Sequence, residues 1–249
     1  MEVQRIDFIA LPVEDLARAD AFYGDTLGLA RNPNSSGERW VEYETGNLTL
    51  ALSQYGGGLA LRVADVAEAR SELEEAGTPF SMDTFDSGVC NGAPFSDPDG
   101  NPLLFHRRYA PSEPFDVPAQ DVERTDFIGV TVKDRADASR FYGDTLGLKR
   151  NPLSSDQWPE YEVENVGLIL STPEQKGDER EFPWGEFALA LRVADVAESM
   201  ERLQGAGVAF PFGEPYDTGV CHMAFLQDPD GNPLILHHRY APYENGSTP

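Results

Sequence analysis

The stretch FYGDTLGL at residues 22–29 occurs again, unchanged, at residues 141–148. Further motifs follow each copy in the same order: ALRVADVAE from Ala60 and Ala190, DPDGNPL from Asp97 and Asp228, and HRRYAP or HHRYAP from His106 and His237. Because order and spacing are kept over such a length, the chain is a duplicated domain and not an array of short repeats. We therefore expect each half to have the same fold.

The repeat divides the 249 residues into a first domain at 1–110, a linker at 111–121 and a second domain at 122–249. The linker contains several prolines and acidic residues and shows neither a helical nor a strand period. Each domain is long enough to bury a core of its own.

Acidic residues dominate the composition, with 43 Asp and Glu against 19 Lys and Arg and a net charge of -24. Nucleic acids and anionic membrane surfaces both require clustered positive charge, so neither is expected as a partner. No apolar run approaches the roughly 20 residues of a membrane span, and the N-terminus has no basic-then-apolar signal region. We expect a cytoplasmic protein. Cys90 and Cys221 occupy equivalent repeat positions and are interpreted as core thiols with no activating base nearby in the sequence.

The first half begins with an alternating, branched segment at 5–13, which predicts a strand. Asp15 is placed to cap a helix that runs to about Thr26. Two strands follow at 39–44 and 47–53, joined through a Gly-Asn turn. A second strand, helix, strand, strand unit covers 58–63, a helix capped by Asp65 and ended by Gly77, 89–96 and 101–108. The second half repeats this plan.

Paired units of this kind, with FYxDxLGL after the first strand and DPDGN before the last, resemble the vicinal oxygen chelate superfamily, which includes glyoxalase I, extradiol dioxygenases and bleomycin-resistance proteins. The resemblance covers about residues 6–240. It implies an α+β fold of four βαβββ units, paired into two glyoxalase-like domains, each a curled mixed sheet around a cleft with helices outside. Single-copy relatives pair two chains, so a monomer is feasible here and a homodimer is compatible with the sequence.

The resemblance also implies where metal ligands would lie. The aligned positions hold apolar residues or glycine: Phe8, Gly58 and Leu104 in the first half, and Phe127, Ala188 and Ile235 in the second. A divalent ion without carboxylate, imidazole or thiolate ligands would lose its hydration with little return. The sequence therefore predicts no metal cofactor. One unconventional set, composed of His222, His237 and Glu160, is kept as an alternative.

Residues two apart on a strand share a face, which predicts the residues around each cleft. They are Phe8, Gly58, Ala60, Arg62, Leu104 and His106 in the first half, and Phe127, Ala188, Ala190, Arg192, Ile235 and His237 in the second. Each set is an apolar floor with one arginine and one histidine, which favours a flat, largely apolar ligand that can carry an acidic group. Alternatively, the arginines pair with neighbouring acids, the histidines bond backbone, and the phenylalanines fill the core.

Three functions stay open at this point. The first is a glyoxalase- or bleomycin-resistance-like protein that binds a small molecule without a metal. The second is a lyase or dioxygenase-type enzyme that uses the unconventional ligands or metal-free acid and base catalysis, with His237, Glu160, His106 and Glu42 as candidate groups. The third is an interaction module whose clefts are filled. The longer stretch at 172–186, with Phe182 and Trp184, is a candidate lid over the second cleft.

Overall fold

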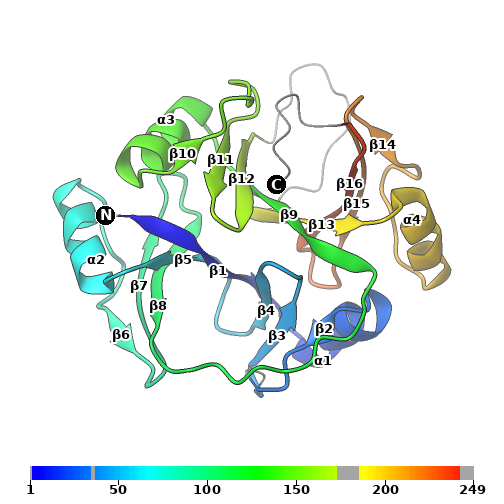
Figure 1. Ribbon diagram of the computed structural model, residues 1–249, viewed down its shortest axis with the longest axis horizontal. Coiled ribbons are helices and arrows are strands. Elements are labelled where there is room, and N and C mark those ends of the chain that lie inside the picture. The colour runs from blue at the N-terminus through cyan, green and yellow to red at the C-terminus, as the bar shows by residue number, and fades with distance from the viewer. Residues whose placement is uncertain (1, 35–36, 173–184, 242–249) are drawn as a thin grey trace.

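The structure is a computed structural model that describes residues 2–34, 37–172 and 185–241. It contains two eight-stranded mixed sheets, one from each half, with the helices at the periphery (Figure 1). The first half comprises β1 Val3–Pro12, α1 Leu16–Asp20, the π-helix η1 Ala21–Thr26, β2 Ala30–Arg31, β3 Trp40–Glu44, β4 Thr49–Ser53, β5 Gly58–Val63, α2 Val66–Glu75, β6 Phe85–Asp86, β7 Cys90–Ser96 and β8 Pro102–Arg108. The second half comprises β9 Val122–Thr131, α3 Arg135–Ser139, the π-helix η2 Arg140–Thr145, β10 Lys149–Arg150, β11 Glu160–Val163, β12 Val166–Ser171, β13 Phe187–Val193, α4 Val196–Gly205, β14 Tyr216–Asp217, β15 Cys221–Gln227 and β16 Pro233–Arg239.

Both sheets have the same topology. The strand order is β2-β3-β4-β1-β5-β8-β7-β6 in the first and β10-β11-β12-β9-β13-β16-β15-β14 in the second. In each, the first strand runs parallel to β4 or β12 and antiparallel to β5 or β13. The predicted α+β fold of two paired domains is confirmed. The short edge strands, such as β2 and β6, were not predicted, because two residues carry no detectable period.

The helices begin where the sequence predicts. The side chains of Asp15, Asp65, Asp134 and Asp195 each accept hydrogen bonds from backbone amides of the first helical turn. The helix expected to reach Thr26 does so in two parts, since α1 continues directly into η1. Within the described residues, no helix has the length and apolar character needed to cross a membrane.

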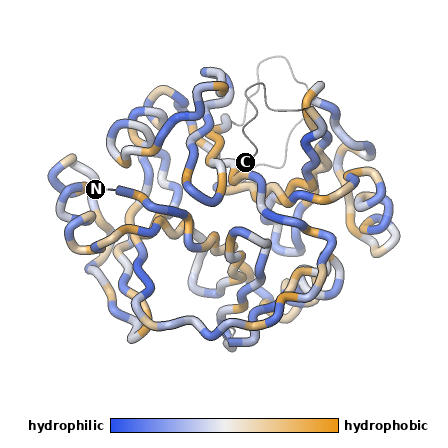
Figure 2. Tube along the Cα trace, in the orientation of Figure 1, coloured by the Kyte–Doolittle hydropathy of each residue, from blue (hydrophilic) through white to orange (hydrophobic). Residues whose placement is uncertain are grey.

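One continuous apolar cluster lies between the helices and the sheets and includes residues of both halves. Val66, Ala69 and Leu73 of α2 are buried in it, as the helical spacing predicts. In Figure 2 the helices show separate apolar and polar stretches, which is the pattern of helices packed on one side only. The sheet face that packs against the helices thus carries the core, and we call the opposite sheet face the inner face.

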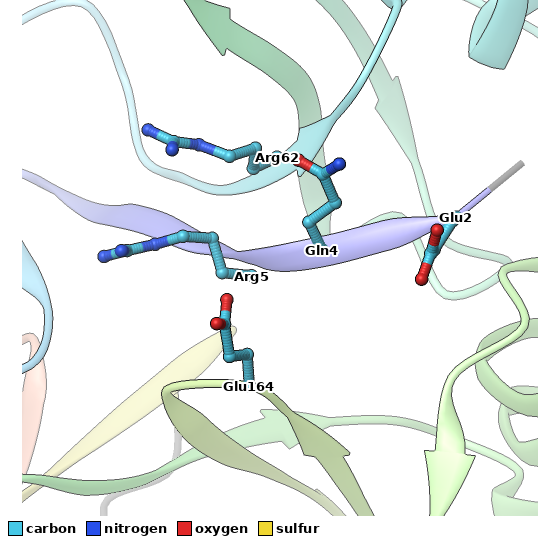
Figure 3. Close-up of a pocket in the computed structure, with 5 residues that line it drawn as sticks. All are labelled: Glu2, Gln4, Arg5, Arg62 and Glu164. Atoms are coloured by element: carbon cyan, nitrogen blue, oxygen red, sulfur yellow. The ribbon is translucent and has the colours of Figure 1, made fainter.

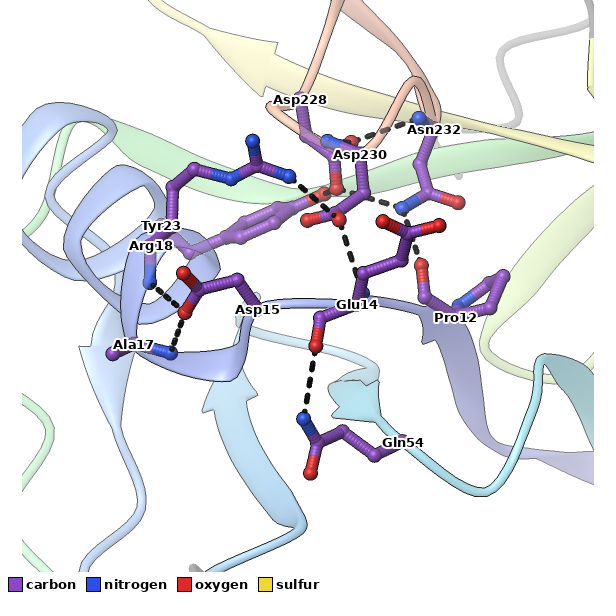
Figure 4. A network of polar contacts seen from close by, with 10 residues as sticks. All are labelled: Pro12, Glu14, Asp15, Ala17, Arg18, Tyr23, Gln54, Asp228, Asp230 and Asn232. Atoms are coloured by element: carbon purple, nitrogen blue, oxygen red, sulfur yellow. Dashed lines mark hydrogen bonds and ion pairs between the residues drawn. The ribbon is translucent and has the colours of Figure 1, made fainter.

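The two repeated motifs meet across the boundary between the halves. The Tyr23 hydroxyl, from FYGDTLGL, donates to Asp228 Oδ2 of the second DPDGNPL at 3.0 Å, and Tyr142 donates to Asp97 Oδ2 at the same distance. Around Tyr23, Figure 4 shows Asn232 reaching the Pro12 carbonyl and Asp230 accepting bonds from the backbone of Glu14. These motifs therefore hold the halves together.

Tyr23→Phe should lower the free energy of unfolding by about 1 to 3 kcal/mol, because it removes a hydrogen bond from a buried carboxylate that cannot exchange it for water. Tyr142→Phe should cost a similar amount. Urea unfolding followed by fluorescence measures both changes. Tyr55→Phe is the control, since that ring is 69% exposed and should change stability little. Equal stability of all three variants would contradict this account of the boundary.

The turn between β3 and β4 also packs closely against the second half. Gly46 has a φ of +85°, and a Cβ there would lie 2.4 Å from the carbonyl oxygen of Glu123. Only glycine satisfies both conditions. Residues 109–121 connect β8 to β9 without a helix or strand, and the exact domain limits stay a prediction.

Candidate functional site

The first strand of each half contains a β-bulge. Ile6 pairs with Leu61 and Phe8 pairs with Ala60, so Asp7 is an extra residue on β1. Since Ile6 is fully buried on the helix side, the bulge directs both Asp7 and Phe8 to the inner face. In β9 the same shift occurs between Thr125 and Phe127, and it places Asp126 on the inner face.

Asp7 is the centre of a charged cluster on the first inner face. Its side chain is 8% exposed, with Oδ2 2.6 Å from His106 Nδ1 and Oδ1 2.8 Å from Arg62 Nε. Arg5 Nε lies 3.5 Å from Oδ1. Neither aspartate was predicted from the sequence, because strict strand alternation would place Asp7 on the helix side.

The second half repeats the cluster around Asp126, whose side chain is 6% exposed. Oδ2 lies 2.5 Å from His237 Nδ1, and Oδ1 lies 2.8 Å from Arg192 Nε. Arg124 takes the place of Arg5, with Nε 3.6 Å from Oδ1. The alternative in which Arg62 and Arg192 pair with a neighbouring acid is therefore present in the structure, while the histidines bond carboxylates and not backbone.

The clusters are positively charged at neutral pH. Burial lowers the pKa of His106, but its hydrogen bonds to Asp7 and Cys90 and their charges outweigh burial and raise it to about 9. The pKa of His237 is raised to about 9 in the same way by Asp126 and Cys221. Burial tends to raise the pKa of Asp7, but the hydrogen bonds and charges of His106 and Arg62 outweigh it. The pKa is lowered overall, so the carboxyl stays ionised. Two arginines and an imidazolium thus surround one carboxylate, in a chain of charge -24.

Each bulge is supported by an asparagine from the other half. Pairing of β1 with β4 begins at Phe8, so Ile6 has no partner on β4. Its amide instead donates to Asn165 Oδ1 at 3.0 Å, and its carbonyl accepts from Asn165 Nδ2 at 2.9 Å. Asn47 does the same for Thr125, with both distances 2.8 Å. The sequence predicted Gly46-Asn47 as a turn only. The Asn47 side chain also holds the backbone of Thr125, the residue before Asp126.

The cysteines differ from the sequence interpretation, which found no base near them. Cys90 lies diagonally across from His106 on the same face of β7 and β8, and the imidazole lowers the pKa of its thiol. The register of β7 and β8, which the sequence does not show, brings Cys90, two residues before Gly92, diagonally next to His106. Cys221 and His237 repeat the contact.

The inner face of the first half has an aromatic floor. The Phe8 ring contacts Trp40 and His106 edge to face, with centroids 5.4 and 5.3 Å apart. Ala60 pairs with both Phe8 and Leu104, so these three lie in one row across the sheet. Gly58 lies one row away, opposite Ala10. Predicted lining residues of the first half thus gather on one face.

The inner face of the second half is more completely filled. Ala188, Ala190, Phe225 and Ile235 form a separate buried cluster, against which Phe127, Phe212, Tyr216 and Met223 pack. In the first half the places of Met223 and Phe225 are taken by Gly92 and Pro94. Ile235 is 1% exposed, whereas its counterpart Leu104 is partly exposed. The candidate lid, with Phe182 and Trp184, lies outside the described residues.

An open pocket of about 520 Å³ adjoins the first cluster. It is lined by Glu2, Gln4, Arg5 and Arg62 of the first half and by Glu164 of the second. Figure 3 shows the guanidinium groups of Arg5 and Arg62 extending in the same direction from neighbouring strands. The pocket therefore gives solvent access to the cationic side of the cluster.

Residues 124–236 match the family model of the glyoxalase/bleomycin resistance protein/dioxygenase superfamily, and residues 5–38 match that of the bleomycin resistance protein-like N-terminal region. The chain belongs to this superfamily. No curated protein sequence matches it.

Solved structures of superfamily enzymes share its fold. The Mn(II)-bound glyoxalase from Novosphingobium aromaticivorans has a TM-score of 0.67 at 17% identity, covering 95% of this chain and 82% of that one. The 2,3-dioxygenase LapB from Pseudomonas sp. KL28 has a TM-score of 0.68 at 14% identity, covering 100% and 96%. Homoprotocatechuate 2,3-dioxygenase from Arthrobacter globiformis has a TM-score of 0.67 at 16% identity, covering 99% and 84%.

The Mn(II) of the glyoxalase neighbour would find no fitting donor set along the first inner face of this chain, as far as the described residues go. The row across the first inner face presents Phe8, Ala60 and Leu104, and none of these can ligate a cation. Throughout residues 2–34, 37–172 and 185–241, no three His, Cys, Asp or Glu side chains are grouped as a metal site would need.

The unconventional set of His222, His237 and Glu160 is not assembled, which corrects that alternative. His222 alternates to the other sheet face, where its Nε2 lies 3.8 Å from Asp217 Oδ2 and its ring packs at a tilt against Tyr240. Burial raises the pKa of Glu160, and the charge of Glu162 raises it further, while a hydrogen bond from Asn151 and the charge of Arg239 oppose the shift. Its counterpart Glu42 accepts a hydrogen bond from Trp40 Nε1 at 2.7 Å. The His237 imidazole is paired with Asp126, and His237 is not among the groups that shift the pKa of Glu160.

Proposed function

We propose that this superfamily member is a small-molecule-binding protein of the glyoxalase and bleomycin-resistance type, without the usual metal site, whose ligand is flat, largely apolar and acidic. The carrying observation is the cationic cluster beside an aromatic floor in the first half. Arg62 Nε lies 2.8 Å from Asp7 Oδ1, and the Arg62 side chain is still 37% exposed. Its terminal N–H groups can therefore donate to a carboxylate or phenolate of a ligand.

The first half is the better site. Phe8 and Trp40 offer ring edges and faces to a flat molecule, and Leu104 is partly exposed beside them. In the second half Met223 and Phe225 cover the equivalent area. Steric access thus favours one working site, with the second half as its scaffold.

Arg62→Ala should weaken binding of an aromatic carboxylate at least tenfold, because a charge-assisted hydrogen bond contributes about 1.5 to 3 kcal/mol. A panel of benzoates, naphthoates and their neutral amides, titrated by Trp fluorescence and calorimetry, supplies the ligand. Arg192→Ala is the matched control in the filled half and should leave that affinity within twofold. Equal affinity of the wild type and Arg62→Ala for every acid that binds would refute the proposal.

Metal content is an independent check. Tag-free protein incubated with iron, manganese, nickel and zinc, then buffer-exchanged, should retain far less than one equivalent by plasma mass spectrometry. A chelator-treated sample gives the baseline. Retention near one equivalent per chain would overturn the metal-free site. Single substitutions of the described carboxylates and imidazoles would then identify the ligands.

A further inference from the structure

Three side chains of the first inner face stand in the order nucleophile, base and orienting acid. Asp7 Oδ2 is 2.6 Å from His106 Nδ1. Because Nδ1 is occupied, Nε2 is the nitrogen left for the Cys90 thiol, which lies diagonally across from His106 on the same face of the β7–β8 pair. Ser87 Oγ lies 3.1 Å from Cys90 Sγ. This is the arrangement that activates a thiol in cysteine nucleophiles.

We propose that Cys90 is a nucleophile that captures acidic, soft carbon electrophiles, with His106 as its base and Asp7 as the positioning residue. This function goes beyond reversible binding and does not depend on it. The thiol is partly exposed, and the open pocket borders the same cluster through Arg5 and Arg62. These two arginines provide the attraction for an acidic group.

The electrostatic surroundings support a thiolate. The hydrogen bond with His106 lowers the pKa of Cys90; burial opposes this, while Ser87 and the charges of His106 and Arg108 add to it. Tyr109 beside β8 and Asp86 on β6 also lie at this end of the sheet, and the Tyr109 hydroxyl donates a hydrogen bond to Asp86. Behind the imidazole stand Asp7, Arg5 and Arg62.

The addition step balances without a further reactant. In the reactive state His106 already holds the thiol proton as an imidazolium, and the Cys90 thiolate attacks the β-carbon of an α,β-unsaturated carbonyl compound. An S–C bond forms, the C=C π bond breaks, and its electrons move to the carbonyl oxygen as an enolate. The imidazolium then returns the proton to the α-carbon. The product is a thioether that keeps every atom of the electrophile.

The second half supplies an internal comparison. Cys221 contacts His237, and Thr218 Oγ1 lies 3.1 Å from its sulfur, as Ser87 does for Cys90. However, Cys221 is only 4% exposed. It should therefore stay unmodified in the folded protein although its neighbours are equivalent.

The test uses the full chain carrying Cys221→Ser, and alkylation of Cys90 by iodoacetamide is followed over pH by intact mass. The rate should rise with a midpoint below the roughly 8.5 of a free thiol. His106→Gln in the same background should return the midpoint to about 8.5 or above. Circular dichroism checks that both proteins are folded. Acrylamide should add its full mass to Cys90.

Charge preference is read from a second pair of reagents. The ratio of iodoacetate to iodoacetamide rates should exceed that of glutathione at least threefold, fall at high salt, and fall in Arg62→Ala. The reciprocal Cys90→Ser protein should take up neither reagent. A Cys90 midpoint at or above that of a free thiol, a midpoint unmoved by His106→Gln, or no reaction at all would each overturn the proposal.

Discussion

Asp126→Ala should lower the free energy of unfolding by about 3 to 5 kcal/mol, the usual cost of removing one partner from a buried charged cluster. The carboxylate is 6% exposed, and its loss leaves His237, Arg192 and Arg124 close together without a counter-charge. Asp7→Ala should have an effect of the same size in the first half. Urea or guanidinium unfolding measures both, with Asp126→Asn as the isosteric variant.

Asp156→Ala is the control for this prediction. Asp156 Oδ1 also lies 2.8 Å from an arginine nitrogen, Nη2 of Arg150, but the Asp156 side chain is 96% exposed. An exposed pair of this kind contributes less than about 1 kcal/mol. If Asp126→Ala costs no more than Asp156→Ala, the cluster is not an element of stability and the bulge has another explanation.

Stability should fall as the pH rises through about 9, the raised pKa of His106 and His237. A group whose pKa is higher in the folded state than its ordinary 6.5 contributes stability that is complete below pH 6.5 and lost above the folded value. Each histidine should account for about 2 to 3 kcal/mol of this loss. Denaturation curves at pH 6, 8 and 10 measure it.

The double variant His106→Gln with His237→Gln isolates the contribution. It should be less stable than the wild type at pH 6 and lose much less stability between pH 6 and 10, since glutamine has no proton to release. Parallel pH profiles for wild type and double variant would show that other groups, such as tyrosines or lysines, carry the alkaline transition.

Much of the fold could be predicted from the sequence because it rests on local signals. Asp15 and Asp65 accept backbone amides at the expected helix starts, and the long strands lie within a few residues of their expected limits. The repeat itself supplied the two-domain architecture. Short edge strands were missed because their pairing depends on neighbours and not on their own residues.

The site was predicted only in part, for a geometric reason. Arg62 and His106 follow regular alternation and were placed on the inner face, where they lie directly opposite each other on β5 and β8. Asp7, which joins them, is displaced to that face by a bulge, and a period-two pattern cannot show this. The thiol contact of Cys90 depends on the diagonal register of β7 and β8, which is set by the whole sheet.

The reciprocal asparagines give the duplication a consequence for how this protein can change. Asn165 supports the strand that carries Asp7, and Asn47 supports the strand that carries Asp126. In an assembly of two separate chains such mutual support would depend on concentration, whereas a tether keeps the partner present at all times. One half is then free to fill its own pocket with Met223 and Phe225 while it continues to brace the other. A protein truncated to one half would lose the asparagine that holds its first strand, so each half depends on the other for the position of its buried aspartate.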